Sequence, residues 1–333
     1  MKKYHIYGLG SALVDTEIEV SDQDLSDLGI DKGLMTLVDE QRQHALLEKL
    51  SDHMTMSKRA CGGSAANTVI SASKFGSKCF FSCKVADDDN GLFYLEDLND
   101  NGVDHGGNGE LCEGITGKCL VMITPDAERT MNTFLGVSEQ LSAHNVIEPA
   151  IAEAEYLYLE SYLVTSPSAQ KASIKACELA RKHDTKIALS LSDPGIVEHF
   201  RSGLEEIIGP GVDLLFCNKQ EALIWCGTEE LDEAMITLQK TAAHFAITLG
   251  NEGSIVFDGF RSHRAESQPV TAVDTNGAGD MFAGAFLYGI TQGYSYEEAA
   301  QFANLAAGAV VSQYGPRLHP AEYSGLKDVF NKG

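Results

Sequence analysis

The chain has 333 residues, of which 44% are hydrophobic, and a formal net charge of −23. This length is enough for one large α/β domain or two modest ones with a substantial core. The strong negative charge argues against a nucleic-acid binder, because such proteins need Lys and Arg to neutralise phosphates. Local features of the chain must therefore hold any anionic ligand.

The N-terminal residues 1–8 lack the apolar core of a signal peptide, and no apolar run approaches the roughly 18 residues of a membrane span. The eight cysteines stand apart, without a C-x-x-C pair or a nearby His cluster. This spacing favours reduced thiols in the cytosol over a metal site. We therefore expect a cytoplasmic protein with no membrane and no nucleic-acid partner.

Residues 4–20 are expected to form one or two strands interrupted by Gly8-Leu9-Gly10. The dinucleotide fingerprint G-x-G-x-x-G is incomplete there, because Leu13 takes the place of the third glycine. Asp15 lies inside this strand region. Its carboxylate either marks a solvated strand end or accepts hydrogen bonds from a ligand.

A helix is expected over residues 41–50, and a second one, rich in small residues, over 64–75. Gly62-Gly63 precedes the second helix, and Asn67 lies one turn into it. These residues either form a tight turn with a capped helix or hold a polyhydroxy ligand through backbone and amide groups. The nucleophile elbow G-x-S-x-G is rejected, because Ala66 fills the last glycine position.

The next segments predict a strand over 79–85 and a helix over 88–101. Residues 117–135 contain two strand-like runs around the turn Thr124-Pro125-Asp126-Ala127-Glu128. This hairpin interrupts the alternation of strands and helices. We therefore expect it to belong to a separate small sheet.

From residue 142 onward the pattern becomes regular. Helices are predicted over 142–154, 167–183, 219–226 and 230–241, and strands over 156–159, 187–191, 213–217 and 245–249. Such alternation is typical of a parallel sheet covered on both faces. Ligands of such sheets lie at the carboxyl ends of the strands, which here selects residues 218–221 and 249–253.

The stretch Asp274-Thr275-Asn276-Gly277-Ala278-Gly279-Asp280 precedes a helical pattern that starts near Met281. A glycine turn at a helix N-terminus offers unpaired N–H groups and a positive dipole end, which together bind anions such as phosphate. Asp280 is either a helix-capping residue or a base for a hydroxyl that attacks a phosphate.

Four features now occur in a consistent order: Gly62-Gly63 with Asn67, Asn218-x-x-Glu221, Thr248 to Gly253, and Asp274 to Asp280. Together they resemble the PfkB, or ribokinase-like, family of carbohydrate and nucleoside kinases, from residue 4 to about 318. The resemblance implies a single kinase domain over 1–333 with a three-layer αβα sandwich and a mostly parallel central sheet. It also implies a small β-sheet lid, formed by insertions at about 13–38 and 112–136.

The resemblance assigns roles to these residues. Asp280 is the expected catalytic base, and the amides of Gly277, Ala278 and Gly279 are the expected anion hole. The residues implied to hold the substrate are Ser11, Asp15, Gly62, Gly63, Asn67, Met131 and Tyr162. Those implied to border ATP are Asn218, Thr248, Gly250, Gly253 and Asn304.

Two metal ions are implied as well. Glu221 is expected to act on Mg²⁺ through water. Asp274 and the loop near Gly315 match loosely the place where family members often bind a monovalent cation such as K⁺.

Residues 123–132 and 10–15 look most like bacterial adenosine-kinase-like members of the family. This favours transfer of phosphate from ATP to the 5′-hydroxyl of a nucleoside, with adenosine converted to AMP. Met131, Phe134, Leu135 and Tyr162 are candidates to hold the base, or they pack the core and lid. Ser11 stands where adenosine kinases commonly carry Asn. The alternatives are a kinase of a free sugar such as ribose or fructose and a non-catalytic nucleoside sensor. Whatever the substrate, the protein is expected to be a monomer or a homodimer.

Overall fold

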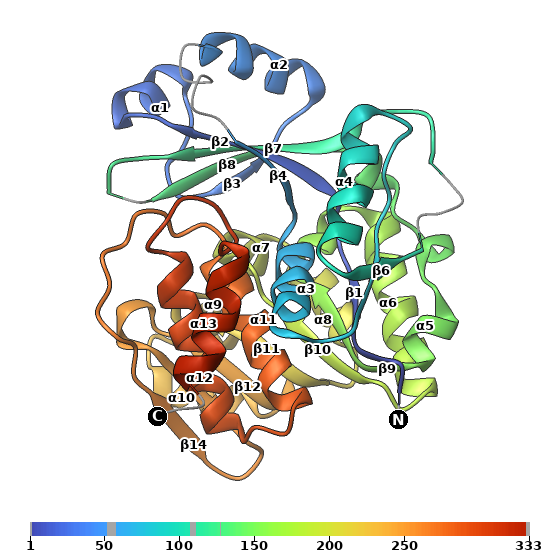
Figure 1. Cartoon of the computed structure of the whole chain (residues 1–333), viewed down its shortest axis with the longest axis vertical. Coiled ribbons are helices and arrows are strands. Elements are labelled where there is room, and N and C mark those ends of the chain that lie inside the picture. The colour runs from blue at the N-terminus through green and yellow to red at the C-terminus, as the bar shows by residue number, and fades with distance from the viewer. Residues whose placement is uncertain (1, 52–57, 107–110, 127, 331–333) are drawn as a thin grey trace.

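The computed structural model describes residues 2–51, 58–106, 111–126 and 128–330. A large body with a central sheet lies below a small sheet (Figure 1). Within the described residues, no helix is both long and apolar enough to cross a membrane. Ala127, in the predicted turn, lies outside the described residues.

The central sheet has nine strands in the order β14-β13-β12-β11-β10-β9-β1-β5-β6. Its pairs are parallel except for those that β13 makes with β12 and β14. The strands are β1 (Tyr4–Leu9), β5 (Cys79–Ser82), β6 (Val103–His105), β9 (Ala154–Glu160), β10 (Lys186–Ser190), β11 (Val212–Asn218), β12 (Ala242–Thr248), β13 (Ser254–Phe257) and β14 (Ser262–Ala265).

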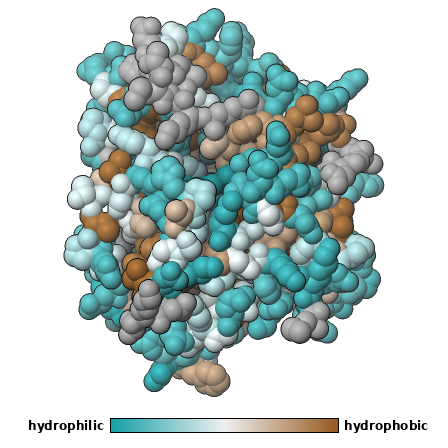
Figure 2. All heavy atoms as spheres, in the orientation of Figure 1, coloured by the Kyte–Doolittle hydropathy of each residue, from teal (hydrophilic) through white to brown (hydrophobic). Residues whose placement is uncertain are grey.

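Helices cover both faces of this sheet, because alternate apolar residues of each buried strand point to opposite sides. In β1, for example, Ile6 belongs to one core cluster, whereas Tyr7 and Leu9 belong to the other. The first face carries α3 (Ser64–Phe75), α4 (Asp89–Asp100), α11 (Ala278–Thr291), α12 (Tyr296–Val310) and α13 (Pro320–Phe330). The second carries α5 (Glu148–Ala152), α6 (Pro167–Lys182), α7 (Pro194–His199), α8 (Arg201–Ile208), α9 (Lys219–Cys226) and α10 (Leu231–Leu238). Hydrophilic residues dominate the outer surface in the view of Figure 2.

The small sheet has five strands in the order β3-β8-β7-β2-β4. They are β2 (Leu13–Glu19), β3 (Met35–Leu37), β4 (Lys58–Gly62), β7 (Thr116–Ile123) and β8 (Arg129–Gly136). Helices α1 (Asp22–Leu28) and α2 (Glu40–Lys49) cover the face that points away from the large body (Figure 1). The period-2 pattern of β7 places Leu120 and Met122 under these helices and Cys119 and Val121 in a separate apolar cluster.

The chain order across the central sheet reverses between β1 and β9. From β1 the chain proceeds outward through β5 to β6, and the later strands then extend from β9 in the other direction. In open α/β sheets the ligand crevice lies at such a switch point, beyond the carboxyl ends of the strands. The fold therefore selects the region after Leu9 and Glu160.

The predicted α/β architecture, with a mostly parallel sheet between helices and a smaller second sheet, is confirmed. Four strands, β4, β6, β13 and β14, were not predicted. The continuous helix predicted over 142–154 is wrong. A 3₁₀ turn (Ala143–Asn145) and the short α5 replace it. Pro149 lies in the first turn of α5, where its missing N–H has no consequence, and it therefore marks a new helix start.

Candidate active site

A cavity of about 670 Å³ lies where the carboxyl ends of the central strands, the start of α11 and the inner face of the small sheet meet. Most of the predicted site residues line it: Ser11, Asp15, Gly63, Asn67, Met131, Tyr162, Asn218, Glu221, Thr248, Gly250, Gly253, Gly277, Ala278, Gly279, Asp280 and Asn304. Gly62, Asp274 and Gly315 are not part of the lining. The fold thus brings together residues that are up to 293 positions apart in the sequence, from Ser11 to Asn304.

The glycine turn before α11 determines where the helix begins. Gly277 is the N-cap with a φ of 73°, and a Cβ on it would lie 2.6 Å from Pro316. Because glycine alone fits there, α11 begins at Ala278, not near Met281 as predicted. Asp280 consequently occupies the first helical turn, so its interpretation as the capping residue is wrong.

The backbone N–H groups in the first turn of α11 point out of its N-terminus, which is the partly positive end of the helix dipole. The Ala278 amide donates a 3.3 Å hydrogen bond to the Thr275 carbonyl. In the part of the chain that the structure describes, no acceptor faces the Gly279 amide. A Cβ on Gly279 would meet nothing within 4 Å. An anion can therefore approach this amide without displacing protein atoms.

The Asp280 carboxylate is held from two sides by residues of α3. Ser64 Oγ donates a 2.6 Å hydrogen bond to Oδ1, and Asn67 Nδ2 lies 3.4 Å from Oδ2. Desolvation raises the pKa of Asp280, and the Ser64 hydrogen bond and the Arg129 charge oppose that increase. A carboxylate with a raised pKa beside an anion site is suited to accept a proton.

Asp15 is 6% exposed, and no other described residue donates a hydrogen bond to its carboxylate. Burial and the nearby Glu17 raise the pKa of Asp15 well above its usual value. A buried carboxylate is destabilised when nothing donates to it, and Asp15 lines the cavity, where a donor can reach it. A ligand with hydroxyl groups would supply such a donor.

Steric limits explain why glycines occupy positions 62 and 63. A Cβ on Gly62 would lie 1.9 Å from Asp15 Oδ1, and a Cβ on Gly63, where φ is 90°, would lie 2.3 Å from the Ser11 carbonyl. The end of β4 therefore passes directly against Asp15 on its way to α3. This close approach supplies the tight turn, and it leaves the Asp15 carboxylate at the cavity wall.

Glu160 was missed by the sequence analysis. It ends β9 at the switch point, is 2% exposed and lines the cavity. Its carboxylate accepts hydrogen bonds from the backbone amides of Ser11 at 2.7 Å and Ala65 at 2.6 Å. Burial raises the pKa of Glu160 to about 7, although these amides oppose the change. An acidic residue at the end of a buried strand was the signal that could have found it.

Asn218 and Glu221 form a reciprocal capping box at the start of α9. The backbone N–H and Nδ2 of Asn218 donate to the Glu221 carboxylate at 2.9 and 2.7 Å. Burial raises the pKa of Glu221 to about 7. Each carboxylate oxygen keeps a lone pair for one further partner, such as a Mg²⁺-bound water. Among the described residues, no group of three or more His, Cys, Asp or Glu side chains could hold a metal ion.

At the opposite end of the cavity, Gly253 and Asn304 help to hold the backbone in place. A Cβ on Gly253, where φ is 88°, would lie 2.1 Å from the Ala265 carbonyl, so this glycine allows β13 and β14 to pair closely. Asn304 Nδ2 donates to the Ala265 carbonyl at 2.9 Å. The Asn304 side chain therefore offers its oxygen, an acceptor, to a ligand in the cavity.

Asp274 and Gly315 meet behind the cavity. The Gly315 amide donates to Asp274 Oδ2 at 2.9 Å, and the Asn276 amide donates to Oδ1 at 2.8 Å. Asp274 is fully buried, so these bonds fix the glycine turn to the segment after α12. The monovalent-cation site stays a prediction.

An apolar wall, contributed by the small sheet, forms one side of the cavity. Its members are Leu13, Met35, Leu37, Cys119, Met131 and Leu135. Tyr162, from the large body, also lines the cavity, whereas Phe134 does not. Arg129, in β8 of the small sheet, donates to the Thr275 carbonyl at 3.0 Å and so connects the small sheet with the turn before α11.

A family model described as pfkB family carbohydrate kinase matches residues 30–322. The chain belongs to this family. The match confirms the predicted family and the predicted class of enzyme, a kinase with an alcohol group as acceptor.

Two solved structures are similar over nearly the whole chain. The adenosine kinase from Sinorhizobium meliloti is 35% identical with a TM-score of 0.92, covering 98% of this chain and 99% of that chain. A probable sugar kinase from Rhizobium etli CFN 42 is 32% identical with a TM-score of 0.92, covering 99% of both chains. A 5-dehydro-2-deoxygluconokinase from Clostridium botulinum is 27% identical over 292 residues, which are 80% of this chain and 82% of that protein.

Proposed function

We propose that this pfkB-family kinase uses ATP and Mg²⁺ to phosphorylate the 5′-hydroxyl of a nucleoside, with adenosine as the first acceptor to test. The observation that carries this proposal is the division of the cavity into two kinds of wall. Asp15, Asn67 and Glu160 lie beside Asp280 and suit the hydroxyl groups of a sugar. The apolar wall of the small sheet, together with Tyr162, suits the faces of a base.

The reaction requires a base, an anion site and in-line geometry, since phosphoryl transfer depends mainly on positioning and charge stabilisation. Asp280 takes the proton from the acceptor hydroxyl. The oxygen of that hydroxyl attacks the terminal phosphorus of ATP, and the bond between this phosphorus and ADP breaks. The Gly279 amide at the start of α11 stabilises the charge that develops on the transferred group. Arg129 can leave the Thr275 carbonyl to add a positive charge.

Residues at the other end of the cavity hold the nucleotide. Thr248 and Gly250 border the phosphates and ribose of ATP, and the oxygen of Asn304 accepts from the amino group of adenine. Mg²⁺, when bound to ATP, neutralises the phosphate charges. Glu221 would hold a water of that ion, and Asn218 fixes Glu221 through the capping box.

The small sheet acts as the lid in this proposal. Its inner face contributes the apolar wall, and Arg129 connects it to the turn before α11. Closing this sheet on the acceptor would exclude water from the transferred phosphate and prevent hydrolysis of ATP.

The test is a panel of nucleosides, ribose, fructose and other small sugars, with release of ADP as the readout. We expect adenosine to give the highest kcat/KM. Turnover of a free sugar without turnover of any nucleoside would overturn the proposal. The variant Tyr162→Ala should raise the KM for the nucleoside by about tenfold, because stacking on a base contributes about 1–3 kcal/mol.

A free-sugar kinase is the second candidate. The polar wall of Asp15, Asn67 and Glu160 could bind a sugar alone, and the chain is similar to a probable sugar kinase and to a 5-dehydro-2-deoxygluconokinase. In that case the apolar wall would only pack the closed lid, and Tyr162→Ala would leave the KM for the sugar unchanged. The non-catalytic sensor is disfavoured, because binding alone does not require the Asp280 base.

A further inference from the structure

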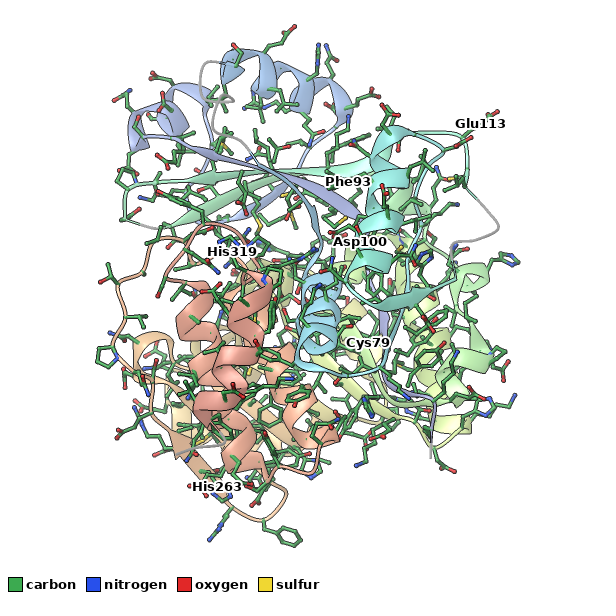
Figure 3. All side chains as sticks on the ribbon, viewed as in Figure 1. Cys79, Phe93, Asp100, Glu113, His263 and His319 are labelled. Carbon is green, nitrogen blue, oxygen red and sulfur yellow. The ribbon has the colours of Figure 1, made fainter. Side chains whose placement is uncertain are left out.

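Arg317 lies in the segment between α12 and α13 and is not among the residues that line the cavity. This segment leads to His319 at the end of α13 nearest the small sheet (Figure 3). The Arg317 side chain is only 15% exposed. Burial of a guanidinium is costly unless its N–H groups find acceptors and its charge is balanced. Its partners therefore indicate why an arginine is retained at this position.

Three separate elements supply these partners. Nη1 donates to Asp97 Oδ2 on α4 at 2.6 Å, which balances the charge. Nη2 donates to the Cys61 carbonyl in β4, the strand that leads from the small sheet into Gly62-Gly63. Nε donates to Asn67 Oδ1 on α3 at 3.1 Å. A single side chain thus joins the segment after α12 to α3, α4 and β4, and one of its three partners, Asn67, lines the cavity.

The contact with Asn67 determines the orientation of that side-chain amide. Because Arg317 has donors and no acceptor, Asn67 must turn its oxygen toward the guanidinium. Asn67 Nδ2 then faces the cavity, 3.4 Å from Asp280 Oδ2. This distance is long for a hydrogen bond, so the same N–H₂ group can also donate to a ligand oxygen beside Asp280.

We propose that Arg317 is a positioning residue of this kinase, which acts through Asn67 and is held in place by Asp97. This inference rests on the proposed function, since its effect is read as phosphoryl transfer to the acceptor hydroxyl. Arg317 contacts neither substrate. It keeps the Asn67 donor directed at the acceptor and at Asp280. A lysine would keep the charge but lose the planar set of donors that reaches three acceptors at once.

The experiment is a double-mutant cycle between Arg317→Lys and Asn67→Ala, measured as kcat/KM for the acceptor. We expect Arg317→Lys alone to lower this value by about tenfold or more, because misplaced reacting groups lose rate steeply. In the Asn67→Ala background, the same change should cost less than about twofold, because the residue through which Arg317 acts is already absent. The KM for ATP should stay the same throughout.

Arg181→Lys is the matched control. Arg181 also donates to backbone carbonyls, those of Ile208 and Gly211, but it does not line the cavity or contact a residue that does. Its substitution should leave kcat/KM unchanged. An equal loss from Arg317→Lys with and without Asn67, or no loss at all, would show that Arg317 only supports the fold. If Arg317→Lys does not fold, Asp97→Asn replaces it in the same cycle, with the same expected non-additivity.

A second measurement does not depend on turnover. The side-chain amide signals of Asn67, assigned by their loss in Asn67→Ala, should follow the ionisation of Asp280 in a pH titration by NMR. In Arg317→Lys this dependence should disappear, and its persistence would overturn the inference. If the wild type phosphorylates no member of the substrate panel, the proposed function fails, and this titration still decides the role of Arg317.

Discussion

At the scale of single residues, Ser64 tunes the group that we propose as the base. Its hydroxyl donates a 2.6 Å hydrogen bond to Asp280 and so opposes the desolvation that raises the Asp280 pKa. Asp280 must be ionised to accept a proton, so turnover should fall as the pH decreases through this pKa. Ser64→Ala removes the hydrogen bond, and the acidic limb of the profile should move to higher pH.

The measurement is the pH profile of kcat/KM for wild type and Ser64→Ala, followed from alkaline pH down to the lowest pH at which both proteins stay folded. The ratio of variant to wild type should be lowest at acidic pH and should increase toward alkaline pH. Asp280→Asn is the reference, with a loss of about 10²–10⁴ in kcat at every pH while ATP still binds. If the ratio of kcat/KM between Ser64→Ala and wild type does not change with pH, Ser64 does not influence the ionisation of Asp280.

Glu221 connects the proposed metal site with stability. Burial raises its pKa from the ordinary 4.5 to about 7. The unfolded chain ionises this group above about pH 4.5, whereas the folded chain keeps it protonated up to about 7. Stability should therefore decrease as the pH increases through this window and stay at the lower level above it.

The glutamine in Glu221→Gln cannot ionise, so the stability of this variant should not decrease over the same pH range. Urea unfolding should show the variant to be more stable than wild type at pH 8, by on the order of 2 kcal/mol, with a difference that shrinks toward pH 5. Its kcat at low Mg²⁺ should fall, since the amide is a poorer acceptor for a metal-bound water. Glu40→Gln, at an exposed position of α2, is the control. Parallel stability profiles for Glu221→Gln and wild type would contradict the assignment.

At the scale of elements, the start of α11 depends on one glycine. Gly277→Ala should destabilise the protein, because its φ is 73° and its new Cβ would clash with Pro316. Gly227→Ala is a matched control, with a φ of 66° and no atom within 4 Å of the added Cβ. We expect the control to cost roughly 1 kcal/mol, from backbone strain alone, and Gly277→Ala to cost at least twice that. Equal losses in urea unfolding would show that the contact with Pro316 is unimportant.

The elements also show what the sequence could predict. Strands such as β10 and β12 are short apolar runs between helical patterns, and their positions were predicted to within a few residues. β4 and β14 are polar and short, and they exist because β2 and β13 offer edges with which they pair. No local pattern carries that information, since pairing with a distant strand decides it.

The same distinction applies to the site. Asp280, Gly277 and Asn67 stand in motifs that can be read locally, and the fold brings them together. Ser64 and Arg317 were missed because their contacts are tertiary: Arg317 and Asn67 are 250 positions apart. The glycine turn was assigned correctly as a helix start, but its register was not, because Pro316 determines which glycine is the N-cap.

At the scale of the whole molecule, the small sheet has two occupied faces. Its inner face lines the cavity, and α1 and α2 cover the outer face through an apolar cluster that includes Ile18, Leu25 and Leu46. A dimer that packs two such sheets face to face would have to displace these helices and expose their apolar sides. That exposure costs about 25 cal/mol for each Å². We therefore predict a monomer rather than a dimer packed through these outer faces.

Sedimentation velocity at micromolar concentration should therefore give the mass of one chain. Leu34 and Leu37, which are 46% and 42% exposed on or beside the edge strand β3, offer the other route to a dimer, by pairing of edges. If a dimer is found, Leu34→Lys should dissociate it only when the two β3 edges form the interface. The substitution should leave the cavity unchanged, because Leu34 does not line it. A dimer that survives Leu34→Lys but is lost when α1 is altered would mean that the helices themselves form the interface. The covered outer face would then be a dimer surface rather than an obstacle to one.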